Sequence, residues 1–392
     1  MATVVVSCYN VASFPEGGGH FWVYMQYVHA LRAAGCEVYW LERFRRGKDR
    51  GRDARAMVSF FQRMSRFGMD RHVLLYTQDD DPNGGGEPII EFVGVTRPDA
   101  EAVLRRADLL LNFHYAIDPH LLSCARRTAL VDIDPGLLQG WISTGLLRVS
   151  PHDAYLTIGE TVGTAEARFP DCGFSWIHFR PPVCLDLWPY RFDPGAEAFT
   201  TVAGWWSGEW VPEKVDGREV LYENTKRISF LDFVELAGRT RQPLELALNM
   251  ADDDGADLDR LLGNGWRVQR SRDVAGNPEQ YHRYVQQSRG EFSCAKPSCM
   301  KLQNAWVSDR TLCYLASGKP AVVQHTGPSS YLPSGLGLFR FTTMDEAAAA
   351  LEAVNADYER NCRAAREIAA TWFDAAPVLE HVLNSALGAT TC

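Results

Sequence analysis

The stretch FPEGGGHFW, residues 14–22, places three glycines and a histidine before a segment with helical spacing. Gly18 and Gly19 would let a phosphate or a sugar approach the backbone, because glycine carries no side chain. His20 stands at the expected start of the helix, where the helix dipole lowers the pKa of an imidazole and keeps it neutral, as a general base requires. The remaining interpretation is that His20 only caps the helix.

A second group with chemical potential is Ser308, Asp309, Arg310 and Thr311. Ser308 occupies an N-cap position before an apolar helical segment that stops at Gly318. Backbone N–H groups and the positive end of the dipole bind anions at such a helix start, and an arginine adds a bidentate fork. These residues predict a diphosphate site, and an ordinary capped helix is the alternative.

Acidic residues and a histidine follow two other expected strands. Asp132 and Asp134 end the run 128–133, and His114 and Asp118 follow the run 108–113. Alternate side chains of a covered strand point to opposite faces, so Asp134 is preferred to Asp132 as the acidic residue of the site. Asp118 or Asp134 is the expected carboxylate that orients a catalytic His20. Asp132 and His114 are expected to contact ligand. The D-x-D spacing also matches a metal-binding pair, and two aspartates that cap the next turn are the third interpretation.

Composition restricts the class of protein. The chain has 392 residues, 46% of them hydrophobic, which is long enough for two domains. A net charge of −9 argues against a nucleic-acid partner, since such proteins normally carry a basic surface. The 10 cysteines show no metal-ligand spacing, and neither a signal peptide nor a membrane span is evident. We therefore expect a cytoplasmic protein and leave its oligomeric state open.

The elements that must position these residues form two alternating series. Strand-like runs and helical segments alternate from residue 3 to residue 158 and again from residue 199 onward, which predicts an α/β fold with two Rossmann-like, doubly wound domains facing a cleft. The expected boundaries are 1–180 for the first domain, 181–196 for a proline-rich linker, 197–372 for the second domain and 373–392 for a C-terminal helix that packs back toward the first.

The segments SRGEFSCAK, from Ser288, and NAWVSDRTLCYLASGKPAVVQHTG, ending at Gly327, carry a resemblance to a known family. The sequence resembles the group 1 glycosyltransferases with the GT-B architecture, and most closely a bacterial branch of them. The resemblance implies metal-independent transfer of a sugar from a nucleotide-diphosphate donor, taken as a UDP-sugar, to a small-molecule hydroxyl or amine. No cofactor is implied.

The resemblance also assigns sides to the cleft. The first domain would bind the acceptor, through His114 and Asp132, and the second would bind the donor. The residue patterns and the resemblance together give the expected donor residues, which are Gly18, Gly19, Trp205, Lys226, Arg227, Glu291, Ser308, Asp309, Arg310, Thr311, Thr326 and Gly327. The glutamate pair of the retaining members is absent, since Ala305 and Cys313 stand at those positions. The stereochemical course therefore stays open.

Other functions fit parts of the pattern. A sugar-nucleotide epimerase shares the expected architecture, and a non-catalytic nucleotide-sugar-binding protein needs only the donor side. A dinucleotide-dependent oxidoreductase is excluded, because GGGH does not give the G-x-G-x-x-G spacing that a tight phosphate turn requires.

Overall fold

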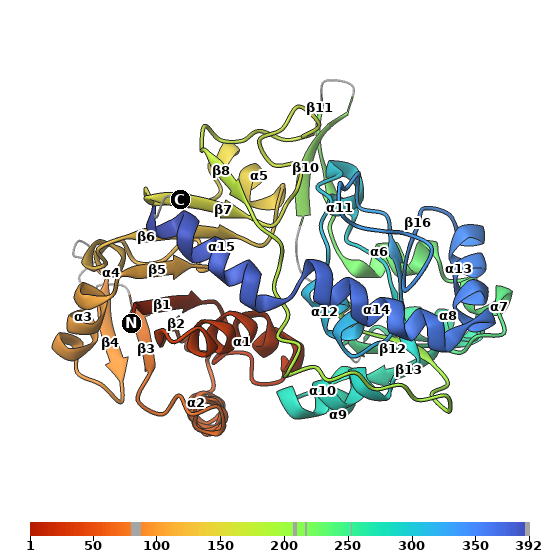
Figure 1. Cartoon of the computed structure of the whole chain (residues 1–392), viewed down its shortest axis with the longest axis horizontal. Helices are drawn as coiled ribbons and strands as arrows, with labels where there is room; N and C mark the ends of the chain where they lie inside the picture. Colours follow the sequence, from red (N-terminus) through yellow and green to blue (C-terminus); the bar gives the residue numbers. More distant parts are fainter. Residues whose placement is uncertain (80–87, 207–209, 216–217, 252, 389–392) are drawn as a thin grey trace.

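Two parallel sheets organise the chain, one in each lobe of the molecule (Figure 1). The computed structural model describes residues 1–79, 88–206, 210–215, 218–251 and 253–388. This arrangement confirms the predicted α/β fold with parallel sheets.

The first sheet has eight strands in the order β4-β3-β2-β1-β5-β6-β7-β8, and all neighbours are parallel except β3 and β4. Its strands are β1 (Thr3–Cys8), β2 (Glu37–Arg43), β3 (Val73–Asp79), β4 (Ile89–Val93), β5 (Leu109–Asn112), β6 (Thr128–Asp132), β7 (Ala154–Thr157) and β8 (Trp176–His178). The helices between them are α1 (Gly18–Ala33), α2 (Arg50–Arg66), α3 (Arg97–Arg106), α4 (Pro119–Cys124) and α5 (Leu137–Ser143).

The second sheet has six parallel strands in the order β13-β12-β9-β14-β15-β16. These strands are β9 (Phe199–Gly204), β12 (Leu244–Asn249), β13 (Arg267–Arg270), β14 (Gly290–Ser293), β15 (Ala321–Gln324) and β16 (Leu338–Phe341). An antiparallel hairpin, β10 (Trp210–Val215) and β11 (Arg218–Glu223), stands apart from both sheets.

Ten helices accompany the second half in the described part of the chain. They are α6 (Lys226–Asp232), α7 (Leu236–Arg239), α8 (Gly255–Gly263), α9 (Ser271–Val274), α10 (Pro278–Gln287), α11 (Pro297–Leu302), α12 (Asp309–Ala316), α13 (Met344–Ala356), α14 (Tyr358–Trp372) and α15 (Ala375–Leu387).

The two lobes meet along an apolar interface around α1. One hydrophobic core runs from β1 and α1 into α10, α12 and α14, and Trp22 donates its indole N–H to the Pro278 carbonyl at 3.0 Å. Helix α15 continues from α14 across the boundary and contacts α1 and β7 of the first lobe (Figure 1). The shared core fixes the start of α1 against the second lobe.

The alternating pattern predicts the central strands well and the peripheral elements poorly. Strand β1, Thr3–Cys8, begins at residue 3, where the predicted alternation starts. The structure adds β4, β8, β16 and the β10–β11 hairpin, none of which the sequence pattern predicts. The edge strands β4 and β8 bury few side chains, so they lack the continuous apolar run that marks a central parallel strand.

Candidate active site

A cavity of about 260 Å³ lies between the lobes. Its first wall is the loop from Phe14 through the three glycines to His20 and Val23, and its second wall combines the end of β9 with the start of α12. We call it the cleft cavity. The structure thus brings Gly18, Gly19 and His20 into one site with Ser308, Asp309 and Arg310.

His20 is held in one tautomer. Its Nε2 lies 2.7 Å from the Tyr9 carbonyl oxygen, which only accepts, so Nε2 carries the hydrogen and the neutral ring keeps the lone pair on Nδ1. Burial lowers the pKa of His20 below its usual value, although the Tyr9 carbonyl and the nearby carboxylates of Asp309 and Asp134 oppose the shift. The imidazole is therefore neutral at physiological pH. A carbonyl, rather than Asp118 or Asp134, orients the ring.

Arg310, near the start of α12, does not present the free guanidinium that the sequence predicts. Ser308 caps the helix by accepting from the Arg310 N–H at 3.3 Å. The Arg310 guanidinium, however, is bound to Glu291 at 2.7 Å, to the Val202 carbonyl at 3.0 Å and to the Ser293 hydroxyl at 2.5 Å. Arg310 therefore cross-links β9 and β14. This corrects the prediction of a free bidentate fork.

Glu291 is likewise part of the scaffold. Its side chain is fully buried beneath Arg310, so it has no access to a donor. Removing either partner would leave a buried charge uncompensated, which makes the pair a structural element of the site.

The aromatic and basic candidates near β9 are also corrected. Trp205 is fully buried, with its indole N–H on Asp257 at 2.9 Å, so it offers no ring face to a ligand. Arg227 forms a two-point contact with the same Asp257, at 2.5 and 3.1 Å, and lies over the Trp206 ring.

Lys226, at the start of α6, has a different environment. Among the described residues it makes no hydrogen bond or ion pair. Burial, reinforced by the neighbouring Arg310 charge, lowers the pKa of Lys226 to about 7, while Glu291 and Asp309 oppose that shift. Lys226 therefore lies close enough to Asp309 and Arg310 for their charges to act on it, and it has no ion pair with the described residues.

The glycine loop is shaped by the second lobe. A Cβ at Gly18 would overlap the carbonyl oxygens of Ala275 and Asn277, and one at Gly19 would lie 2.7 Å from the Tyr281 ring. The glycines therefore permit close approach of α1 to α10. They also line the cleft cavity, so the packing explanation adds to the ligand-approach interpretation.

The aspartates at the end of β6 take separate roles. Asp132 is fully buried and accepts from Gln139 and Thr157, each at 2.9 Å, and burial raises its pKa to about 7. Both of its carboxylate oxygens are engaged, because Oδ1 accepts the Asp134 N–H at 3.0 Å. Such an enclosed side chain suits neither acceptor contact nor one half of a metal-binding pair. Asp134 instead lines a pocket and accepts from the Tyr115 hydroxyl at 3.1 Å.

Asp118 caps α4 and lines neither the cleft cavity nor the pocket of Asp134. Its Oδ1 accepts from the His120 and Leu121 N–H groups at 2.9 and 3.3 Å. His114 lies in the same pocket as Asp134, stacked on Tyr9 with ring centroids 5.2 Å apart. The structure thus places His114 beside Asp134 and moves Asp118 into a structural position.

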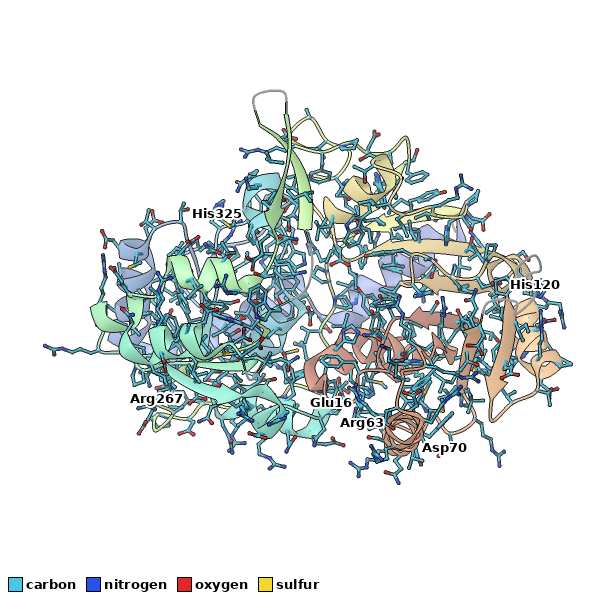
Figure 2. All side chains as sticks on the ribbon, turned by 180° about the vertical axis from the view of Figure 1, so that it is seen from behind. Glu16, Arg63, Asp70, His120, Arg267 and His325 are labelled. Atoms are coloured by element: carbon cyan, nitrogen blue, oxygen red, sulfur yellow. The ribbon has the colours of Figure 1, made fainter. Side chains whose placement is uncertain are left out.

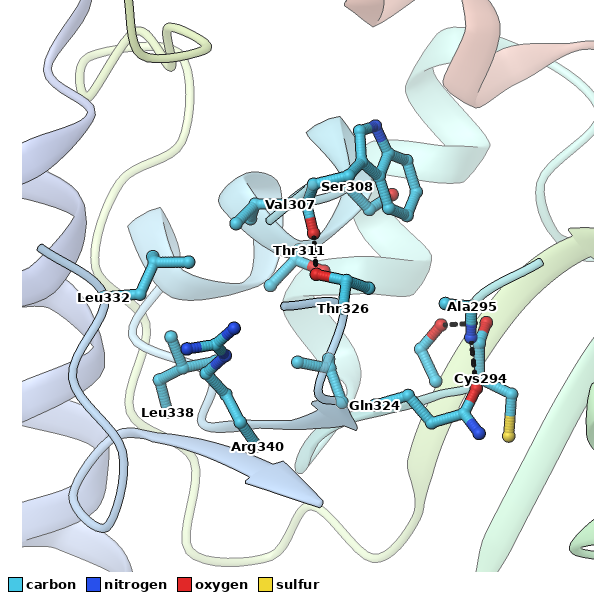
Figure 3. Close-up of a pocket in the computed structure, with 13 residues that line it drawn as sticks. Cys294, Ala295, Val307, Ser308, Thr311, Gln324, Thr326, Leu332, Leu338 and Arg340 are labelled. Atoms are coloured by element: carbon cyan, nitrogen blue, oxygen red, sulfur yellow. Dashed lines mark hydrogen bonds between the residues drawn. The ribbon is translucent and has the colours of Figure 1, made fainter. Parts of the chain in front are cut away.

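A small pocket of about 30 Å³ opens behind α12, at the carboxyl ends of β14 and β15 (Figure 3). Thr311 and Thr326 line it, and the Thr326 hydroxyl donates to the Trp306 carbonyl at 2.7 Å. Gly327 follows with φ 137°, where a Cβ would lie 2.5 Å from the Gln303 carbonyl oxygen. Thr326 and Gly327 therefore shape the loop before α12.

Within the described residues, one group of three potential metal ligands lies close together: Glu101, His120 and Cys124. His120 is at the outer end of the first lobe, remote from Glu16 of the cleft cavity (Figure 2). Glu101 is already bound to Arg97 at 2.8 Å and Arg105 at 3.1 Å. This group has no place in the cleft.

Sequence reasoning missed the aromatic residues that surround His20. Tyr9 directly follows β1 and supplies the carbonyl that fixes the tautomer, and Tyr24 packs edge-on to the ring at 5.4 Å. The position of Tyr9 at a strand end was an available signal. Trp141 lines the pocket of Asp134 and His114. No sequence signal pointed to it, because it lies on a short helix.

No protein-family model matches the sequence, and no curated protein matches it. Solved structures match along the whole chain, with 98% of this chain and 99% of the other covered in each of three examples. An alpha-glucosyltransferase in complex with UDP and a 13-mer DNA containing an HMU base has a TM-score of 0.61 at 10% identity. HepE of Anabaena in complex with UDP-glucose has a TM-score of 0.59 at 11% sequence identity. TarM of S. aureus, in a complex that includes UDP, has a TM-score of 0.59 at 10% sequence identity. The chain therefore has the two-lobed GT-B fold of these glycosyltransferases.

Proposed function

We propose that this protein is a metal-independent glycosyltransferase that moves a sugar from a nucleotide-diphosphate donor to a hydroxyl or amine of a small-molecule acceptor. The observation that carries the proposal is the cleft cavity, in which neutral His20 of one lobe faces the start of α12 in the other. The UDP named in the similar structures supports a UDP-sugar as donor.

The donor diphosphate would lie at the start of α12. The N-terminal N–H groups of that helix and its dipole favour an anion there, and Lys226 supplies an unpaired cation nearby. Asp309 at the same helix start disfavours a dianion, so the charge of Lys226 carries much of the recognition. These groups stabilise the leaving diphosphate without a metal ion.

His20 would remove the proton of the acceptor. The acceptor oxygen or nitrogen bonds to the anomeric carbon of the sugar, its proton passes to Nδ1 of His20, and the bond from that carbon to the diphosphate oxygen breaks with its electron pair. Nucleoside diphosphate leaves. The carboxylates of Asp134 and Asp309 stabilise the imidazolium that forms.

The first experiment is a thermal-shift panel of nucleotide sugars with and without EDTA, followed by turnover assays with the donor that binds. A ligand that binds only the folded state raises the melting temperature. We expect a nucleotide sugar to do so equally in both conditions. If no nucleotide, free or sugar-linked, shifts the melting temperature, the proposal fails, and conversion of the donor without any acceptor would instead identify an epimerase.

The second experiment tests the base. His20→Ala should lower kcat by about 100-fold or more while donor affinity persists. His120→Ala is the matched control, because that imidazole is exposed at the outer end of the first lobe (Figure 2). Wild-type turnover in His20→Ala would remove His20 from this role.

A further inference from the structure

A second cavity, of about 430 Å³, lies beside His20 in the first lobe. Five of its lining residues carry a tyrosine, phenylalanine or tryptophan ring, and we call it the aromatic pocket; these residues are Tyr9, Tyr24, Phe113, Tyr115 and Trp141. Leu146 and Leu147 also line it, and Leu146 is 70% exposed. Walls of this kind favour a flat apolar molecule, because aromatic side chains contribute large contact areas and stack on rings.

The aromatic pocket adjoins the group assigned as the base. Tyr9 and Tyr24 both line it, and both contact His20, one through its carbonyl at 2.7 Å and the other ring-to-ring at 5.4 Å. Asp134, which acts electrostatically on His20, lines the pocket too. A molecule held there would contact two tyrosines that themselves contact His20.

The pocket also carries an unpaired positive charge. The Arg45 guanidinium lines it and lies 4.7 Å from the centroid of the Tyr9 ring, and no carboxylate of the described residues pairs with it. His114 beside it stays neutral, because burial together with the charges of Arg45 and Arg43 lowers its pKa to about 4. Nδ1 of His114 is buried without a hydrogen-bond partner among the described residues. Arg45 and this imidazole leave room for an anionic, hydrogen-bonding substituent.

We propose that the aromatic pocket binds the acceptor, and that the acceptor is an aromatic compound bearing a hydroxyl and a carboxylate, with the carboxylate beside Arg45. The assignment of this molecule as acceptor rests on the proposed function. A sugar acceptor would need polar partners around its whole ring, whereas leucines and aromatic carbons form much of this lining.

The test is isothermal titration of the full chain without donor. The ligands are para-hydroxybenzoate and para-coumarate, each compared with the corresponding neutral alcohol, para-hydroxybenzyl alcohol or para-coumaryl alcohol, and methyl glucoside represents a sugar. We expect at least one acid to bind about 10-fold or more tightly than its alcohol, as a charge-assisted contact gives, and methyl glucoside to bind more weakly than either.

Variants assign the contacts. Arg45→Gln should abolish the preference for the acid and leave the affinity for the alcohol unchanged, whereas Trp141→Ala should weaken both by about 10-fold. Arg55→Gln, an exposed arginine on α2, is the matched control and should leave all affinities unchanged. Tighter binding of methyl glucoside, absence of binding by both acids, or an acid preference that survives in Arg45→Gln would overturn the proposal.

Donor binding is measured separately with UDP-glucose, so the two proposals fail independently. If the acids bind in an Arg45-dependent way but no nucleotide sugar binds, the proposed aromatic carboxylate site is supported and the proposed transferase function is refuted. Turnover with a sugar as acceptor and no binding of the aromatic acids would keep the transferase and refute this acceptor class.

Discussion

The proposed donor site depends on the charge of Lys226 more than on any other side chain. Arg310 and Arg227 are already bound to Glu291 and Asp257, whereas Lys226 makes no hydrogen bond or ion pair with the described residues. Lys226→Met keeps much of the length of the side chain and removes the charge. One charge-assisted contact to phosphate contributes about 2 kcal/mol, so the variant should bind UDP-glucose about 30-fold more weakly.

The lowered pKa gives the same site a pH dependence. In the free protein the pKa of Lys226 is about 7, so the ammonium is present below that pH and is lost above it. A bound diphosphate favours the ammonium and raises this pKa, so binding above pH 7 must take up a proton. Affinity for UDP-glucose should therefore be highest below pH 7 and fall by up to about 10-fold per pH unit above it, until the contribution of the charge is gone.

Isothermal titration of UDP-glucose from pH 6 to pH 8.5 measures the affinity at each pH. Repeating it in buffers of different ionisation enthalpy measures the number of protons taken up on binding. UDP-glucose is the suitable probe because neither of its phosphates ionises near neutral pH. Lys48→Met is the control, because Lys48 is exposed in the loop before α2. If Lys226→Met binds with the wild-type affinity and the wild-type pH profile, the assignment of the diphosphate to this side of the cleft is refuted.

Two further substitutions test the scaffold. Gly18→Ala would place a methyl group against two carbonyl oxygens of the second lobe, and should destabilise the protein by about 1–3 kcal/mol in urea unfolding. Gly255→Ala should not destabilise the protein, because the space around its Cβ is open. Equal stability of the two variants would contradict the packing argument. Glu291→Gln should cost about 3–5 kcal/mol, because it leaves the Arg310 charge buried without its counter-ion. A melting temperature unchanged from the wild type would show that the pair is not needed for stability.

The repeating pattern of apolar strands and amphipathic helices was enough to predict both parallel sheets. Strand β6, for example, is buried at every position, and the residues between Thr128 and Asp132 are all apolar. Strand β4, at the sheet edge, has a single buried position, Ile90, and was not predicted. The hairpin β10–β11 belongs to neither sheet, so the alternation of strand and helix carries no information about it.

The sequence predicted which segments meet at the cleft cavity better than it predicted the contacts of their side chains. A capped helix start is a local feature, and Ser308 does cap α12. Which charges neutralise one another is not local, because Glu291 and Arg310 meet only after β14 and α12 have packed. The same packing buries Trp205 and pairs Arg227 with Asp257, which removes two donor candidates that looked exposed in the sequence. Lys226 stayed a candidate because it forms no hydrogen bond or ion pair with the described residues, although Glu291 and Asp309 are near enough to act on its pKa.

In the glycine loop, the packing role of Gly18 and Gly19 stands beside the ligand-approach role that we propose for them. Gly18 and Gly19 are required where α1 meets residues 275–281, more than 250 positions along the chain, and no local pattern reveals that contact. The contact also decides how near the start of α1 comes to α12, and so how near His20 comes to the donor side. A side chain at Gly18 would push the two lobes apart at this point. Gly18→Ala should therefore lower turnover through the spacing of the cleft, even where it leaves every group that binds or reacts unchanged.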